Sequence, residues 1–258
     1  VSPVVIEAGG ELDLQGFDNT ISSLSGSGDI VLNPRTSLME SSDDLVEGAD
    51  LRIHAGNFAG SIHDGGFSGL GSVSKSGEGD LLLSGVNAYA APTFIKGGTL
   101  IAASSSALSS NSDFTLSDSG VIDLSSYSRE SRFRFDEKAD YSAYLKSLKI
   151  SDQSRLMVSS LAPLRVKEQL QFDRGDIAAF LESGANSTAP IQIDTKGKFV
   201  FSKGRNLGPA SLYMVVSNEE ARQQEGTWNV IDGEVQNADE LAKNTYLLVP
   251  AEYTSVFA

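Results

Sequence analysis

The stretch SVSKSGEGDLLLSGVNAYAAPTFIKGGTL, residues 72–100, carries the features from which the fold can be inferred. Within it, SGEGDLLL at 76–83 repeats SGSGDIVL at 25–32 after an interval of 51 residues. Self-similarity at a fixed interval is typical of solenoids, in which each repeat forms one coil. The interval of 51 residues predicts two coils of roughly 25 residues each.

Alternating apolar residues predict short strands on both sides of this stretch. Leu12 and Leu14, or Phe199 and Phe201, recur with a period of two, so one face of each strand turns inward. No single strand could bury that face alone, whereas stacked coils would form a continuous core with glycine at the corners. The predicted fold is therefore all-β, a right-handed parallel β-helix (solenoid).

The composition narrows the classes of partner. The chain has 258 residues, of which 40% are hydrophobic, and a formal net charge of −14. Proteins bind nucleic acids and anionic lipids through Lys and Arg side chains, which are outnumbered by acidic residues here. We therefore expect no nucleic-acid partner and no binding to a membrane surface. No apolar run approaches the length of a membrane span and no leader precedes Val1, which indicates a mature piece without membrane insertion.

Cysteine is absent, which excludes disulfides, thiolate metal sites and cysteine nucleophiles. It also suits a chain that is exported unfolded through an oxidising compartment, because no disulfide loop can form there.

The composition changes near Ser131, after which Arg, Lys and aromatic residues become more frequent. We expect residues 1–130 to form coils with the glycine-rich repeats and residues 131–258 to continue the β-helix. Helical propensity marks ADYSAYLKSL (139–148), SNEEARQQEG (217–226) and NADELAKNT (237–245). These segments are predicted to be excursions from the coils.

Residues 72–100 resemble the passenger-associated transport repeat of bacterial autotransporters. The family pattern has a Lys, spaced glycines, an alternating strand, an Asn-x-Tyr turn and a final Gly-Gly-Thr-Leu. Ala90-Ala91-Pro92 departs from it. The matching residues are Lys75, Gly77, Gly79, Leu81, Leu83, Ser84, Gly85, Asn87, Tyr89, Ile95, Gly97, Gly98, Thr99 and Leu100.

The resemblance implies a passenger segment of a Gram-negative autotransporter, exported through the periplasm and the outer membrane to the cell surface or the medium. It also implies a partner in the precursor, namely the protein's own outer-membrane β-barrel. TWNVIDG (227–233) resembles strands near the C-terminal end of such passengers, which would put residues 131–258 near the autochaperone region.

One tripeptide suggests a receptor. Arg174-Gly175-Asp176 lies between two strand-like segments, and an exposed turn there could offer its carboxylate to an integrin. Glycine is common in turns for conformational reasons alone, so the competing interpretation is that the tripeptide occurs here by chance.

Other residues suggest enzymes only weakly. Ser119 in SDSG faintly resembles a protease nucleophile, for which His54 or His63 would have to act as the base. Paired acids suggest a glycosidase, although neighbours on a strand point to opposite faces. These pairs are Asp43-Asp44, Asp136-Glu137 and Asp239-Glu240. The calcium-binding nonapeptide and the EF-hand loop are both missing from the sequence.

Aromatic residues are expected to stack in the core between coils rather than to form a ligand platform. These are Phe58, Phe67, Tyr89, Phe94 and Trp228.

The sequence thus predicts a non-enzymatic β-helical scaffold for adhesion or host-cell interaction, with no cofactor and no metal. Its expected partner is a host-cell surface protein or receptor, with an integrin as the specific hypothesis. Self-association through exposed coil edges is a further expectation. Two alternatives stay open, a receptor-binding toxin-like effector and a β-helical carbohydrate-active enzyme.

Overall fold

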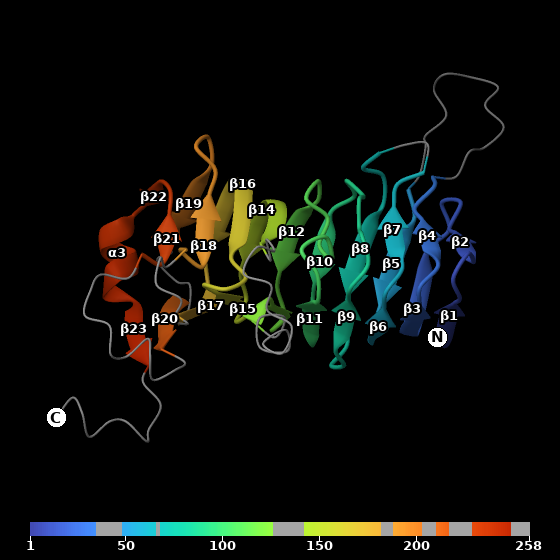
Figure 1. Ribbon diagram of the computed structural model, residues 1–258, viewed down its shortest axis with the longest axis horizontal. Helices are drawn as coiled ribbons and strands as arrows, with labels where there is room; N and C mark the ends of the chain where they lie inside the picture. The colour runs from blue at the N-terminus through green and yellow to red at the C-terminus, as the bar shows by residue number, and fades with distance from the viewer. Residues whose placement is uncertain are drawn as a thin grey trace.

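A computed structural model shows a rod built from stacked coils (Figure 1). It describes residues 1–34, 48–65, 68–125, 142–181, 188–202, 210–216 and 229–248. The colour passes from blue to red along the long axis, so each coil lies next to its neighbours in the sequence. All of the strand pairings in the two sheets are parallel. The predicted all-β solenoid is confirmed.

The strands form columns that run along the rod. At the N-terminal end, β1 (Ser2–Ile6) pairs with the long strand β3 (Asn19–Gly26), which begins two columns. The first column contains β5 (Asp50–Ile53), β8 (Ser72–Lys75), β10 (Thr93–Ile95), β12 (Asp113–Leu116), β14 (Ala143–Ile150), β16 (Leu164–Phe172), β19 (Lys198–Phe201) and β22 (Val235–Gln236).

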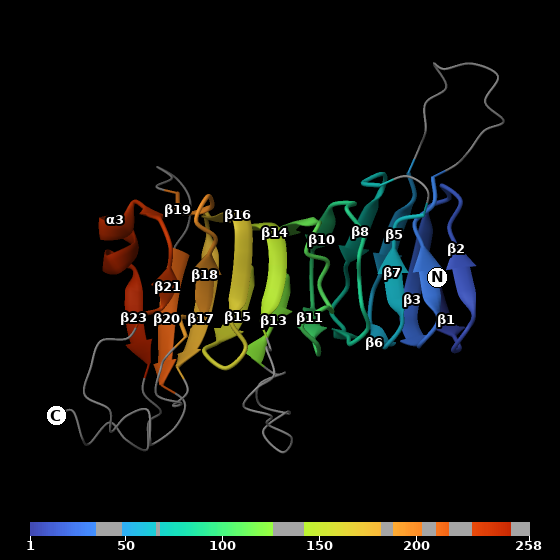
Figure 2. The same cartoon turned by 45° about the horizontal axis from the view of Figure 1, so that its top comes forward.

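The second column is the row labelled β17, β20 and β23 at the C-terminal end in Figure 2. It contains β6 (Gly56–Phe58), β9 (Leu81–Leu83), β11 (Thr99–Ala102), β13 (Val121–Asp123), β15 (Arg155–Ser159), β17 (Gly175–Leu181), β20 (Ala210–Val216) and β23 (Thr245–Leu248).

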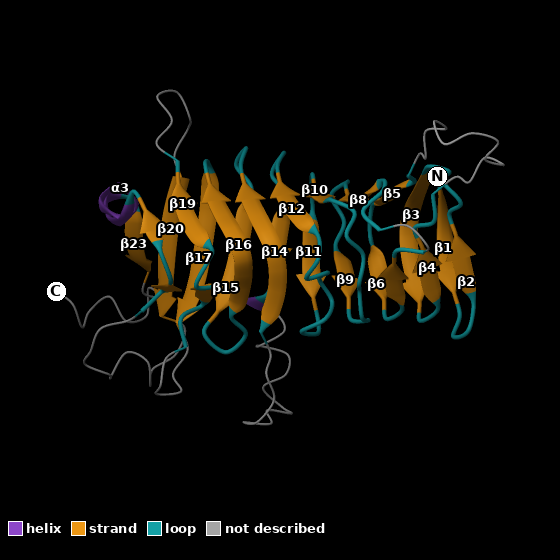
Figure 3. Ribbon diagram, turned by 90° about the horizontal axis from the view of Figure 1, so that it is seen from above, coloured by secondary structure: helices purple, strands orange, loops and turns teal. Residues whose placement is uncertain are grey.

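Shorter rows complete the coils. Near the N-terminus, β2 (Glu11–Asp13), β4 (Asp29–Val31) and β7 (Ser61–His63) form a separate three-stranded sheet. Near the C-terminus, β18 (Ile191–Ile193) pairs with the first half of β16, and β21 (Ile231–Asp232) pairs with β18. In Figure 3 the strands stand side by side along the axis, with α3 (Ala238–Lys243) at one end.

The coils are shorter than the sequence interval suggested. Ile53, Lys75, Ile95 and Leu116 follow one another in the first column at intervals of 22, 20 and 21 residues. The two copies of the repeated octapeptide do not stack in register, because Asp29–Val31 belongs to the separate sheet whereas Leu81–Leu83 belongs to the second column. Local similarity therefore identified the strands but not their columns.

Inward side chains of successive coils form one continuous core. Ile21, Ile53 and Ile95 lie in the same column and are almost completely buried, as period-two alternation predicts. Phe58 and Tyr89 are also buried, as expected, whereas Phe94 is only partly buried. Phe67 and Trp228 lie outside the described residues.

The helix predictions had mixed outcomes. NADELAKNT contains α3, which follows Asn237 in a left-handed conformation, so that prediction is confirmed. The prediction for 139–148 was wrong, because residues from Ala143 onward form β14, with Leu145 and Leu148 turned into the core. The segment 217–226 lies outside the described residues, as does the expected division at 130/131, which stays a prediction.

The transport-repeat coil as candidate functional site

The predicted repeat residues come together in one coil. This coil runs from β8 through β9 to β10 and is continued by β11. Leu81, Leu83 and Leu100 point into the core, while Thr99 is partly exposed. Ser84 donates its backbone N–H to the carbonyl of Phe58 in the preceding coil. The apolar members of the pattern therefore fill the core, and the polar members make the contacts described next.

Lys75 occupies a position that neighbouring coils fill with isoleucine. Its exposed fraction is 1%, and its Nζ donates to three backbone carbonyls: Gly97 at 2.8 Å, Gly77 at 2.9 Å and Ser76 at 3.2 Å. Burial lowers the pKa of the Lys75 amine, and the nearby Asp80 carboxylate opposes that shift. The lysine thus ties one corner of its own coil to the equivalent corner of the next.

Two glycines allow coils to approach closely at the corners. A Cβ on Gly85 would lie 1.8 Å from the carbonyl oxygen of Gly60 in the preceding coil. Gly98 has a left-handed φ of +59°, and a Cβ there would lie 2.7 Å from Lys75 Nζ. Gly85 is therefore required by space, and Gly98 is required both by space and by its backbone conformation.

Asn87 links three consecutive coils. Its side-chain Oδ1 accepts from the backbone N–H of Ile62 at 2.8 Å, and its Nδ2 donates to the carbonyl of Ala107 at 2.6 Å. The residue is 5% exposed, so both backbone groups would lose their partner if the amide were removed.

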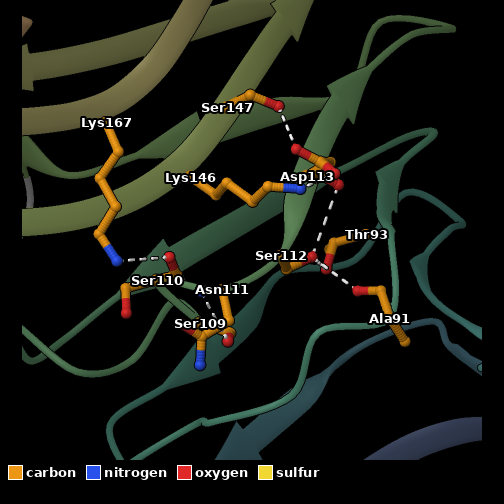
Figure 4. Close-up of polar contacts among 10 residues, drawn as sticks. All are labelled: Ala91, Thr93, Ser109, Ser110, Asn111, Ser112, Asp113, Lys146, Ser147 and Lys167. Carbon is orange, nitrogen blue, oxygen red and sulfur yellow. Dashed lines mark hydrogen bonds and ion pairs between the residues drawn. The ribbon is translucent and has the colours of Figure 1, made fainter. Parts of the chain in front are cut away.

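Tyr89 begins a buried chain of hydroxyl groups. Its OH lies 3.0 Å from Thr93 Oγ1, which lies 2.8 Å from Ser112 Oγ, and Ser112 Oγ donates to the Ala91 carbonyl at 2.7 Å. Figure 4 shows the Thr93, Ser112 and Ala91 part of this chain. Burial raises the pKa of Tyr89 to about 12, although the hydrogen bond with Thr93 acts in the opposite direction.

Three residues of this network were missed from the sequence. Thr93, Ser109 and Ser112 are buried, and Ser109 Oγ donates to the carbonyl of Tyr89. Ser109 and Ser112 belong to the polar run SSNS, which has the composition of an exposed turn. The one signal in the sequence was their spacing, because Ser109 and Ser112 lie about one coil after Tyr89 and Ala91, 20 and 21 residues along the chain.

Comparisons with known proteins agree with this geometry. Residues 73–102 match the passenger-associated-transport-repeat family. Over 94 residues the chain is 37% identical to the adhesin BmaC autotransporter of Brucella suis biovar 1 (strain 1330). The predicted resemblance to an autotransporter passenger is therefore confirmed. The match covers 36% of the segment and spans about 2% of the length of that relative, and no solved structure matches.

The location of the passenger follows from this assignment. Passengers are exported, so the predicted position at the bacterial cell surface or in the extracellular space is confirmed. Within the part that the structure describes, no helix is long and apolar enough to cross a membrane.

The weak enzyme hypotheses find no assembled site among the described residues of the passenger. Ser119 lies in the turn after β12, whereas His54 follows β5, three strands earlier in the first column, and His63 lies in β7. Asp239 and Glu240 both lie in the first turn of α3, and Glu240 pairs with Lys243 at 3.1 Å. The other acidic pairs, Asp43-Asp44 and Asp136-Glu137, lie outside the described residues.

Acidic and histidine side chains do not gather into a metal site in the described ranges, where no three of them come together.

The Arg-Gly-Asp tripeptide is part of the coil rather than an exposed turn. Gly175 begins β17 and is buried, with a φ of +118°, and a Cβ there would lie 2.2 Å from the Ser154 carbonyl oxygen. The Asp176 carboxylate pairs with Arg155 at 3.2 Å. Arg174 precedes the strand and is partly buried. The expected exposed turn was wrong, and integrin binding through these three residues stays a prediction.

Proposed function

We propose that this passenger segment is a non-catalytic adhesive scaffold that contacts host cells. Continuity of the rod is the observation that supports the proposal. Each coil pairs with the next from β1 to β23, and buried side chains such as Asn87 connect coils in addition to the backbone ladder. A rod of this kind can hold an outward surface at a fixed distance from the bacterium. The likeness to a relative described as an adhesin points in the same direction.

A cell-binding experiment tests the proposal. The purified chain is labelled and titrated onto cultured epithelial cells, and the same chain is used to compete with bacteria that display the whole passenger. We expect saturable binding and reduced bacterial attachment, both lost when the coils are unfolded. Folded chain that neither binds cells nor competes with the bacteria would contradict the proposal.

The control is the heat-unfolded chain at equal concentration, because it keeps the net charge of −14 but loses the ordered surface. Equal binding of the folded and the unfolded chain would indicate that the cells bind the chain through its amino-acid composition and not through a folded surface.

A further inference from the structure

The outer face of the first column carries a line of polar side chains across four coils. Asp113, Ser147 and Gln169 are aligned in register, followed by Lys198. A parallel line contains Thr115, Lys149 and Gln171. We call these seven residues the polar ladder. Together with Glu168 and two core residues beneath, Phe114 and Leu148, six of them line an open groove of about 290 Å³.

Charge is distributed unevenly along the rod, and five of the seven ladder residues lie in its less acidic part. Residues 1–125 contain 16 acidic and 4 basic residues, a net charge of −12, whereas residues 142–202 contain 6 acidic and 8 basic residues, a net charge of +2. Four lysines belong to this face: Lys146 and Lys149 on β14, Lys167 on β16 and Lys198 on β19. The same face holds three carboxylates, Asp113, Glu168 and Asp173, so the four lysines exceed them by one and an anion meets less repulsion here than on the acidic coils of residues 1–125.

Hydrogen bonds hold the polar groups of the ladder in place. Gln169 Nε2 donates to Gln171 Oε1 at 3.2 Å, and Gln171 Nε2 donates to both Asp173 carboxylate oxygens at 2.8 and 2.9 Å. Asp173 also pairs with Lys149 at 3.6 Å. Side chains that are already oriented lose less entropy when a ligand binds, which favours a specific site over a merely solvated face.

The second half of the groove is organised around Asp113, which accepts from Lys146 Nζ at 2.8 Å and from the Ser147 hydroxyl (Figure 4). Lys167 Nζ donates to the carbonyl of Ser110 at 3.1 Å. Neither Lys167 nor Lys198 has a carboxylate partner among the described residues. These two amines remain available to an anionic ligand.

The geometry points to a linear acidic polysaccharide, bearing carboxylate or sulfate groups, that lies along the rod axis across the polar ladder. Strands in a sheet repeat about every 4.8 Å, so a chain of small rigid units running across them meets amide, hydroxyl and ammonium groups at each coil. Phe94 precedes Thr115 in the same line and is partly exposed, which offers a ring to the apolar face of a sugar. Duplex DNA would extend beyond the groove onto the acidic coils beside it, which repel its phosphates.

This inference rests on the proposed adhesive function and names the class of ligand that the adhesive surface takes. The probe is immobilised heparin, a sulfated uronate polysaccharide, with neutral dextran as the reference. The full chain is compared with the triple variant Lys149→Gln, Lys167→Gln and Lys198→Gln. A matched triple variant outside the groove, Arg52→Gln, Arg155→Gln and Lys243→Gln, removes the same charge.

We expect the ladder variant to bind heparin at least tenfold more weakly and the matched variant to bind within twofold of the natural chain. Binding should weaken with added salt and be absent on dextran. Equal loss in both triple variants, or equal binding to dextran, would overturn the inference. Unfolding curves of the three chains show whether each is folded.

Host cells treated with glycosaminoglycan-degrading enzymes separate this inference from the proposed function. If the chain binds treated and untreated cells equally, adhesion stands and the acidic-glycan ligand fails. If it binds heparin through the ladder but no cells, the ligand class stands and host-cell adhesion fails.

Discussion

Residues 1–125 and residues 142–248 build the same coil by different means. In the first region, strands β5 to β13 are three or four residues long, and consecutive coils touch through glycines and buried polar side chains. In the second, β14, β16, β17 and β20 have seven to nine residues. The ring of Phe172 there packs against those of Phe199 and Phe201, at centroid distances of 6.4 and 5.5 Å.

This difference shows what each half contributes. Short strands give few backbone hydrogen bonds per coil, so the first region depends on contacts that tolerate no change in shape. Longer strands and aromatic packing give the second region more pairing and more apolar burial per coil. The second region can therefore carry a varied outer face, such as the polar ladder, without loss of the coil.

The largest expected effect is at the glycine corner of the first region. Gly85→Val would place Cβ 1.8 Å from the Gly60 carbonyl oxygen, so the coils must separate. We expect a loss of more than about 4 kcal/mol in the free energy of unfolding. Urea denaturation followed by circular dichroism measures it. Gly9→Asn is the matched control, because Gly9 has a left-handed φ and open space around its Cβ position; a similar loss there would contradict the close-approach account.

The aromatic core of the second region should respond nearly as strongly. Phe172→Ala removes a completely buried ring, at a cost of about 3–5 kcal/mol. Since coils contact only their neighbours, hydrogen exchange should accelerate mainly in residues 142–248 and leave 1–125 protected. Phe17→Ala, at a site 58% exposed, should change stability by no more than about 0.5 kcal/mol. Uniform loss of protection along the whole rod would speak against independent regions.

The amide bridge of the first region should have a smaller effect. Asn87→Ala leaves the Ile62 N–H and the Ala107 carbonyl buried without a partner, which costs about 2–4 kcal/mol in the free energy of unfolding. Asn57→Ala, at an exposed position on β6, serves as the control. A stability equal to that of the natural chain would show that water or backbone movement replaces the bridge.

The smallest effect concerns alkaline pH. The pKa of Tyr89 is about 12 in the folded chain against an ordinary 10.0, so between these values the unfolded state holds fewer protons and stability falls as pH rises. We expect a loss of about 1 kcal/mol between pH 9 and pH 11 from this group. Tyr89→Phe should lack that increment when both chains are unfolded in urea at the two pH values. Parallel pH profiles would show that Tyr89 ionises freely in the folded state.

Local pattern was enough to predict which residues face the core. Period-two alternation identified strands such as that at Phe199 and Phe201, and the motif around Lys75 and Asn87 identified a coil with buried polar contacts. The helix expected at 139–148 failed because propensity was outweighed by pairing of β14 with β12 and β16.

Register and long-range contacts could not be predicted. The partners of each strand lie 18 or more residues away, so two similar octapeptides could belong to different columns. Ser109 and Ser112 resemble loop residues until the neighbouring coil supplies the Tyr89 and Ala91 carbonyls. Likewise, Gly175 and Asp176 would form an exposed turn only without neighbouring strands, but Asp176 pairs with β15 and both residues pair with β20.

The alignment of coils in parallel register is the central claim, and it can be tested with engineered cysteines because the chain has none of its own. Thr115 is the direct neighbour of Lys149, whereas Gln171 lies one strand further. Neighbouring strands are about 4.8 Å apart, within the range of a disulfide, and twice that distance is beyond it. We predict that Thr115→Cys with Lys149→Cys forms an intramolecular disulfide on mild oxidation, detected by peptide mass spectrometry, and that Thr115→Cys with Gln171→Cys does not. Efficient cross-linking of the second pair, or failure of the first in the folded chain, would contradict the stacking of the coils and the ladder built on it.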